Sequence, residues 1–232
     1  MFHASVGLSS ATRFTHTQFT LARPSTPLLS RAGIARAALE LIDEHGFDAL
    51  TTRRLARRLG VKDPSLYNHI SSRDDVLDEV HALIIDEELP PMPLEGDWRA
   101  ALAEFARSYR RAFARHPHVI ATIARRPIST PVSLRVYEDL FRFLEHHGFD
   151  APAVLAITAA IDFLCLGAAI EPFAAGYVRA PSEYEDDYPH LARALKHGEL
   201  ESADERGFEL ALAALVDRFA LMRRPNPART QQ

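Results

Sequence analysis

The sequence predicts an all-α protein: a three-helix head followed by a larger helical domain. From Ser30 almost to the end of the chain, apolar residues recur three and four positions apart, the spacing of one helix face. No stretch alternates apolar and polar residues as a half-buried strand would, and no segment repeats with a period of about 20–50 residues. Caps and glycine or proline breaks bracket the periodic segments, as expected at helix ends.

The first four helices each begin at a residue whose side-chain oxygen can cap a helix N-terminus. These caps are Ser30, the pair Thr51 and Thr52, Asp63, and Ser72. The first helix is expected to end at Gly46 and the second at Gly60, where a left-handed residue commonly follows a helix. Pro64 suits the first position of the third helix, and the fourth runs to about Leu89.

A proline-rich stretch, residues 90–93, ends the fourth helix and marks a hinge or domain boundary. Six further helices are expected at 97–116, 117–126, 131–147, 152–176, 189–197 and 203–222. The acidic stretch 178–188 is expected to be a loop. The predicted organisation is a tail at 1–28, a head at 29–75, a helical domain at 76–225 and a tail at 226–232.

Composition excludes several classes of protein. The chain has 232 residues, 47% hydrophobic and 25% charged, which is typical of one or two globular domains. Its net charge of −4 means that contact with nucleic acid requires a local basic patch. The single cysteine, Cys165, excludes an intrachain disulfide and a Cys-based zinc site, which suits the cytoplasm. The richest apolar run, 151–169, is broken by Asp162 and Gly167, so no membrane span is expected.

The segment 51–70, TTRRLARRLGVKDPSLYNHI, has the layout of a helix-turn-helix, whose second helix lies in the DNA major groove. Its first helix places Leu55 and Leu59 inward and carries basic residues but no acid on the other face. The basic residues of this segment are Arg53, Arg54, Arg57, Arg58 and Lys62. A solvated helix more often mixes signs, whereas phosphate neutralisation needs one sign. The alternative is a polar helix in a bundle.

The exposed positions of the third helix hold small or planar hydrogen-bonding groups, which suit phosphate oxygens and base edges. They are Lys62, Ser65, Tyr67, Asn68 and His69. The 28 residues before the head are rich in Ser and Thr and contain no acid. Two interpretations of them stay open: a disordered or mistakenly included tail, or a basic arm that contacts DNA beside the head.

One continuous block of motifs identifies the head more closely. It comprises His45-Gly46-Phe47, Ala49-Leu50-Thr51, Leu55-Ala56, Leu59-Gly60-Val61, Leu66-Tyr67-Asn68-His69-Ile70 and Arg73. With this block, residues 30–80 resemble the DNA-binding domain of the tetracycline-repressor family of bacterial transcription regulators. The stretches PLEGDW (93–98) and FLCLGAAIE (163–171) are similar to the ligand domain of the branch that gives the family its name.

The resemblance implies roles for individual residues. Thr52 and Arg53 match positions that contact phosphate and base, and Arg73 matches a phosphate contact that is usually lysine. The positions that read bases match Ser65, Tyr67, Asn68 and His69. For Lys62, at the start of the reading helix, charge alone argues for a phosphate contact.

The resemblance also implies a ligand pocket in the second domain. Family members that bind tetracycline hold it as a magnesium chelate through a histidine, and that position is Ile123 here. An alkyl side chain cannot coordinate a metal, so we expect neither tetracycline nor magnesium, and no metal or other cofactor. The expected pocket is largely apolar and is lined by Phe105, Tyr109, Phe113, Ile120, Ile123, Tyr137, Phe141 and Phe163, with Asp162 and Glu171 as its polar points. The same aromatic stripe could instead be plain core.

The expected function is that of a ligand-responsive repressor which binds a palindromic double-stranded DNA operator as a homodimer and is released by a small-molecule inducer. The dimer would form through the helices at 153–176 and 203–222, which are apolar enough for a four-helix interface. Two alternatives stay open. One is an activator or ligand-independent regulator with the same head. The other is an all-α enzyme or carrier, which no catalytic motif favours.

Overall fold

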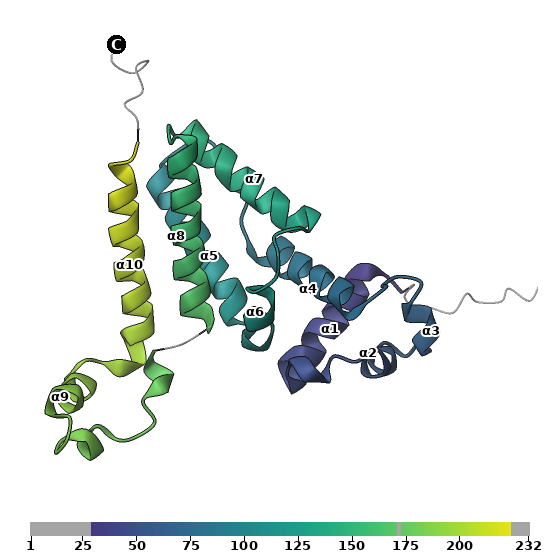
Figure 1. Cartoon of the computed structure of the whole chain (residues 1–232), viewed down its shortest axis with the longest axis horizontal. Helices are drawn as coiled ribbons and strands as arrows, with labels where there is room; N and C mark the ends of the chain where they lie inside the picture. The colour runs from purple at the N-terminus through teal and green to yellow at the C-terminus, as the bar shows by residue number, and fades with distance from the viewer. Residues whose placement is uncertain (1–28, 171–172, 224–232) are drawn as a thin grey trace, which may run out of the picture.

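The computed structural model describes residues 29–170 and 173–223, and every regular element within them is helical, which confirms the all-α prediction. The helices are α1 (Arg31–His45), α2 (Thr52–Leu59), α3 (Asp63–Leu66), α4 (Arg73–Glu88), α5 (Trp98–Ala114), α6 (Pro117–Ile123), α7 (Pro131–His146), α8 (Ala151–Ile170), α9 (Pro189–His197) and α10 (Ala203–Ala220). In Figure 1, α1, α2 and α3 form one end of the molecule, and α8 and α10 stand side by side at the other.

Three of the predicted caps are present. The side-chain oxygens of Ser30, Thr51 and Ser72 each accept a hydrogen bond from the backbone N–H three residues later. The prediction for α3 is wrong: Asp63 is the first residue of this helix and Lys62 occupies the cap position, without a side-chain cap bond. In the first turn the Asp63 carboxylate still complements the positive end of the helix dipole.

Helix α8 is described to Ile170, and residues 171 and 172 lie outside the described part of the chain. The residues Ala174–Gly176 form a 3-10 turn and not the α-helix that was predicted to run to Gly176. The Asp204 carboxylate on α10 accepts hydrogen bonds from the backbone N–H groups of Phe173, at 2.7 Å, and of Ala174. The acidic stretch that follows contains one short 3-10 turn, Pro181–Tyr184, within the predicted loop.

Helix α4 belongs to the head and to the second domain at once. Its buried face, which includes Val76, Val80 and Ile84, packs in one apolar core with α1 and α2 and with residues of α5 and α6. Two ion pairs, Arg31–Glu79 and Arg36–Glu87, tie α1 along the same helix. The predicted boundary between residues 75 and 76 thus falls inside an element that both parts share.

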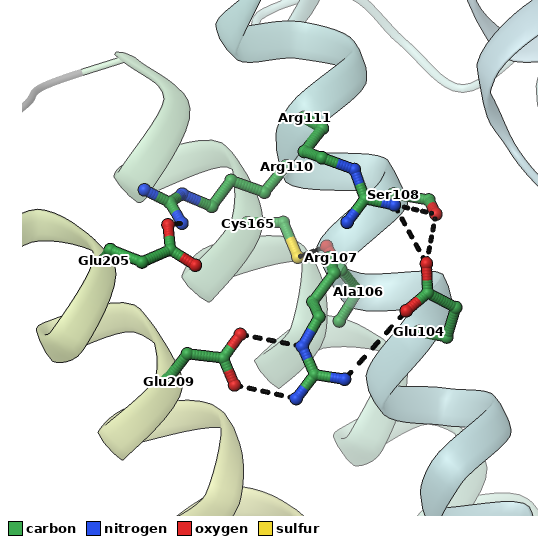
Figure 2. Close-up of polar contacts among 9 residues, drawn as sticks. All are labelled: Glu104, Ala106, Arg107, Ser108, Arg110, Arg111, Cys165, Glu205 and Glu209. Atoms are coloured by element: carbon green, nitrogen blue, oxygen red, sulfur yellow. Dashed lines mark hydrogen bonds and ion pairs between the residues drawn. The ribbon is translucent and has the colours of Figure 1, made fainter.

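A second core lies among α5, α7, α8 and α10. Figure 2 shows the polar contacts that fix α5 against α10: the Arg107 guanidinium donates two hydrogen bonds of 2.7 Å to the Glu209 carboxylate. Next to it, Arg110 pairs with Glu205 and lies over the Phe208 ring. Bidentate arginine–carboxylate pairs hold a defined geometry, so α10 is set at a fixed angle to α5.

Cys165 lies where α8 crosses α5, and its thiol donates to the Ala106 carbonyl oxygen at 3.3 Å (Figure 2). Burial raises the pKa of this thiol to about 12. Because only the thiolate is a good nucleophile, Cys165 is a packing residue.

Among the described residues, one helix is long and apolar enough to cross a membrane; it begins at Ala151 and contains α8. The core helix of a folded domain meets the same criterion. Here α8 packs against α5, α6, α7 and α10, and Ile157, Ile161 and Cys165 are fully buried between them. Its outer side carries exposed apolar residues, among them Leu155 and Phe163.

Candidate functional site

The basic surface predicted on the head is present, with one exception. Arg53, Arg54, Arg57 and Lys62 are exposed, and none of them pairs with an acidic side chain in the part of the chain that the structure describes. Arg58 is the exception, because its guanidinium bonds to the carboxylates of Glu40 and Glu44 on α1, at 3.0 and 2.7 Å. It ties α2 to α1 and is not part of the free basic surface.

The segment that contains the predicted base-reading residues is held in place by two buried side chains. Leu66 and Ile70 are buried in the head core, which fixes the segment between them. Tyr67 then projects outward with 62% of its surface exposed, and Asn68 is exposed beside it. Ser65 and His69 are half-buried. The segment thus offers hydroxyl, amide and imidazole groups on a rigid support.

Three predicted residues from different elements meet in a groove of the head. Thr52 at the start of α2, Tyr67 after α3 and Arg73 at the start of α4 all line it. Arg73 is held in place by Phe47: it donates to the Phe47 carbonyl oxygen at 2.6 Å and lies 3.9 Å from the centre of the ring. A guanidinium has five N–H donors, so this bond leaves donors for a phosphate.

A cavity of about 150 Å³ lies among α4, α5, α6, α7 and α8. Six of the predicted pocket residues line it: Phe105, Tyr109, Phe113, Ile123, Tyr137 and Asp162. The residues of this group come from four helices, so the structure brings together positions that lie up to 57 residues apart along the chain, from Phe105 to Asp162.

Three predicted pocket residues lie elsewhere, and a fourth is outside the described part of the chain. Ile120 is buried in the head core, and Phe141 packs beside Tyr137 in the second core. Phe163 is 77% exposed, because the residue next to Asp162 on a helix points about 100° away from it. Glu171 lies outside the described residues.

At the polar part of the cavity, a tyrosine hydroxyl meets a carboxylate. The Tyr137 hydroxyl donates to Asp162 Oδ2 at 2.6 Å, and Tyr109 lines the cavity together with this pair. Burial raises the pKa of Asp162, because a desolvated carboxylate favours its neutral form. Burial likewise raises the pKa of both phenols, so they act as hydrogen-bond donors near neutral pH.

The sequence analysis missed the α4 side of the cavity, where Asp78 and His81 line the wall. Arg126, just after α6, joins them and bonds to Asp74 at 2.8 Å and to Asp78 at 2.7 Å. The signal in the sequence was the spacing of these α4 residues at 74, 78 and 81, which is one helix face. The cavity wall is therefore bonded to the helix that completes the head.

His81 makes folding stability depend on pH. Burial lowers its pKa from 6.5 to about 4, and its Nδ1 lies 3.3 Å from the Ser133 hydroxyl. Unfolded protein binds this proton below pH 6.5, whereas folded protein does not until about pH 4, so the free energy of unfolding falls as the pH drops through this window. The contribution is up to about 3 kcal/mol.

We expect urea unfolding of a His81→Gln variant to depend less steeply on pH between 6.5 and 4 than that of the wild type. His118→Gln, at an exposed position on α6, is the matched control and keeps the wild-type slope. Parallel slopes for the wild type and His81→Gln would show that His81 is not held neutral.

The head and the second domain each match a model of a known protein family, and relatives match most of the chain. A family model described as bacterial regulatory proteins, tetR family, matches residues 34–80, and one described as tetracyclin repressor-like, C-terminal domain, matches residues 90–220. The chain is 32% identical over 202 residues to an HTH-type transcriptional regulator of Saccharopolyspora erythraea, covering 82% of this chain and 86% of the relative. It is also 32% identical over 208 residues to the class D tetracycline repressor protein of Escherichia coli, covering 81% and 93%.

Among solved structures, the TetR-family protein ActR of Streptomyces coelicolor, in complex with actinorhodin, is similar in fold. The TM-score is 0.71 at 23% identity, over 85% of this chain and 98% of ActR.

Proposed function

Because the chain belongs to the tetracycline-repressor family of bacterial transcription regulators, we propose that it is a repressor which binds a palindromic operator as a homodimer and is released by a small, largely apolar ligand. As a family member it has a helix-turn-helix head and a ligand-binding domain, and it is not an enzyme. We place it in the cytoplasm, where it meets DNA. The observation that carries the proposal is α4, which both completes the basic head and lines the cavity.

The head supplies the DNA contacts in this proposal. Exposed arginines of α2 and Lys62 neutralise phosphates, and Arg73 donates from the groove of the head. Tyr67 and Asn68 reach base edges in the major groove, because their neighbours Leu66 and Ile70 anchor the segment. The residues proposed to contact DNA are Thr52, Arg53, Lys62, Ser65, Tyr67, Asn68, His69 and Arg73.

The outer faces of α8 and α10 supply the dimer contacts. Leu155 and Phe163 on α8, Leu210 on α10 and Leu221 just after α10 are large, apolar and exposed. Soluble monomers rarely expose contiguous apolar patches of this kind, and two such helices from each chain would form a four-helix interface. A twofold dimer would place two heads on half-sites about one helical turn apart.

Ligand binding would reach the head through α4. A ligand in the cavity contacts the wall that contains Asp78 and His81, and Arg126 connects this wall to Asp74 at the first turn of α4. A ligand that prefers a shifted α4 would favour dimers whose head spacing does not match the operator. Repression would then end.

The cavity does not fit a magnesium chelate. Ile123 is buried in its wall, and among the described residues no three His, Cys, Asp or Glu side chains gather as a metal site. Asp78 is paired with Arg126, and Asp162 accepts a hydrogen bond from the Tyr137 hydroxyl. We therefore propose a ligand other than tetracycline, bound without a metal ion, although the class D relative is named for tetracycline.

The proposal is tested by selecting binding sites from a pool of randomised duplex DNA and measuring affinity for the selected site and for random DNA. We expect a palindromic site, bound about 10³-fold or more tightly than random DNA at about 150 mM salt. Weak binding that is equal on both DNAs and disappears with salt would mean that the head contacts only phosphates. That result would contradict a sequence-specific regulator.

A further inference from the structure

The cavity contains a carboxylate that no cation of the protein neutralises. Asp162 lies in its wall and accepts a hydrogen bond from the Tyr137 hydroxyl. In the described part of the chain, no arginine, lysine or histidine forms an ion pair with it. Asp162 is half-buried, and a partly desolvated carboxylate without a counter-charge is costly, so a cationic ligand would gain by pairing with it.

The carboxylate also has hydrogen-bonding capacity to spare. Its two oxygens offer about four acceptor sites, and the Tyr137 hydroxyl uses one of them. A ligand with several N–H donors can use the remaining sites without displacing Tyr137. An ammonium group has three donors, which makes it a suitable partner.

The remaining charges of the cavity wall also favour a cation. Asp78 and Arg126 neutralise each other at 2.7 Å, and burial keeps His81 neutral by lowering its pKa. Because Asp78 and Arg126 cancel, the ionised form of Asp162 would give the wall a net charge of −1, and a bound cation favours that ionised form. An anionic ligand would have to compete with Asp74 and Asp78 for Arg126 while facing Asp162.

The rest of the wall is suited to an aromatic ring. Phe105, Tyr109 and Phe113 lie in a row along α5, with ring centres 6.0 and 5.2 Å apart. Such rings pack against an aromatic ligand at their edges or faces and attract a nearby cation. A cavity of about 150 Å³ is large enough for one benzene ring.

We propose that the ligand is a small aromatic amine, bound as its ammonium ion. The ammonium group bonds to Asp162 beside the hydroxyls of Tyr109 and Tyr137, and the aromatic ring packs against Phe105 and Phe113. This inference rests on the proposed function, in which the cavity is the ligand site, and it adds the chemical class of the ligand.

The test compares matched probes that differ only in their end group. One series is phenethylamine, 2-phenylethanol and 3-phenylpropionate; the second is tryptamine, tryptophol and indole-3-propionate. Binding is measured by calorimetry on the full chain without DNA. We expect the amine of at least one series to bind about tenfold or more tightly than its alcohol and its acid, since charge-assisted hydrogen bonds are the stronger ones.

An Asp162→Asn variant keeps the shape of the side chain and removes its charge. We expect it to lose about tenfold or more in amine affinity while its affinity for the alcohol changes little. Asp186→Asn, which removes an exposed carboxylate from the acidic loop, is the matched control and binds the amine as the wild type does. Circular dichroism and melting temperatures establish that both variants are folded.

Two results would overturn the inference: no amine binds in either series, or the alcohol or acid binds as tightly as the amine. The proposed function is judged separately, by adding the amine to the complex of protein and operator. If the amine binds through Asp162 but operator DNA stays bound, the ligand class stands and release by this ligand fails. If the protein binds operator DNA but no amine binds the free protein, the proposed function as a regulator is supported and the proposed ligand class is contradicted.

Discussion

A protein carrying both Phe163→Asp and Leu210→Asp is expected to be a monomer and to bind its operator about 10³-fold more weakly than the wild type. The two side chains are 77% and 74% exposed, on the outer faces of α8 and α10, so the substitutions remove no core packing within one chain. In the proposed dimer, each aspartate would be buried opposite an apolar surface, which is costly. Two linked heads gain about 10²- to 10⁴-fold from binding both half-sites together, and a monomer loses this gain.

Light scattering coupled to size-exclusion chromatography measures the mass, and a titration with operator DNA measures the affinity. Leu134→Asp is the matched control, because Leu134 is 52% exposed but lies on α7. It should remain a dimer and bind operator normally. A double variant that stays dimeric would contradict the α8–α10 interface, and a monomer with full affinity would contradict operator binding by a dimer.

Replacing Arg53 and Tyr67 together by alanine is expected to weaken operator binding by about 100-fold or more. Each good contact to a base contributes about 1–3 kcal/mol of discrimination, and loss of a phosphate contact lowers affinity for all sequences. Both side chains are exposed, so the melting temperature should hardly change. Binding to random DNA should fall less than binding to operator, and the preference for operator should shrink.

Matched controls for this pair lie far from the head. Arg142→Ala removes an exposed arginine of α7, and Tyr188→Ala removes a tyrosine with 59% exposure before α9, close to the 62% of Tyr67. Both should bind operator as the wild type does. If the double variant also binds operator like the wild type, the assignment of the reading surface is wrong.

The head was predictable because its signals are local. A cap is decided by a hydroxyl and an N–H three residues later, and the caps at Ser30, Thr51 and Ser72 are present as predicted. The ion pairs of Arg58, in contrast, depend on residues far from it in the sequence. Its partners Glu40 and Glu44 lie 18 and 14 residues earlier, on a helix whose angle to α2 only the packed core determines.

The sequence indicated many of the residues that line the cavity, but not which side chains point into it or that α4 contributes to its wall. Periodicity identified the aromatic row of α5, yet it could not tell that Asp162 points inward and Phe163 outward. Asp78 and His81 look like ordinary surface residues in the sequence, because their role depends on the approach of Arg126 from the segment after α6. The contact between Phe173 and Asp204 likewise joins residues 31 positions apart.

The apolar core that the head shares with the second domain has a consequence for the construction of chimeric regulators. Exchanging heads between relatives is usually planned at a domain boundary, and residue 75 would be the obvious junction. Here that junction would separate Val76 and Val80 from the α1 surface on which they pack, and would split the Arg31–Glu79 pair between two parents. A transplanted head needs its own α4 up to about Leu89, and that helix brings with it two residues of the cavity, Asp78 and His81. With the proposed function, the choice of operator and the choice of ligand would therefore be inherited together.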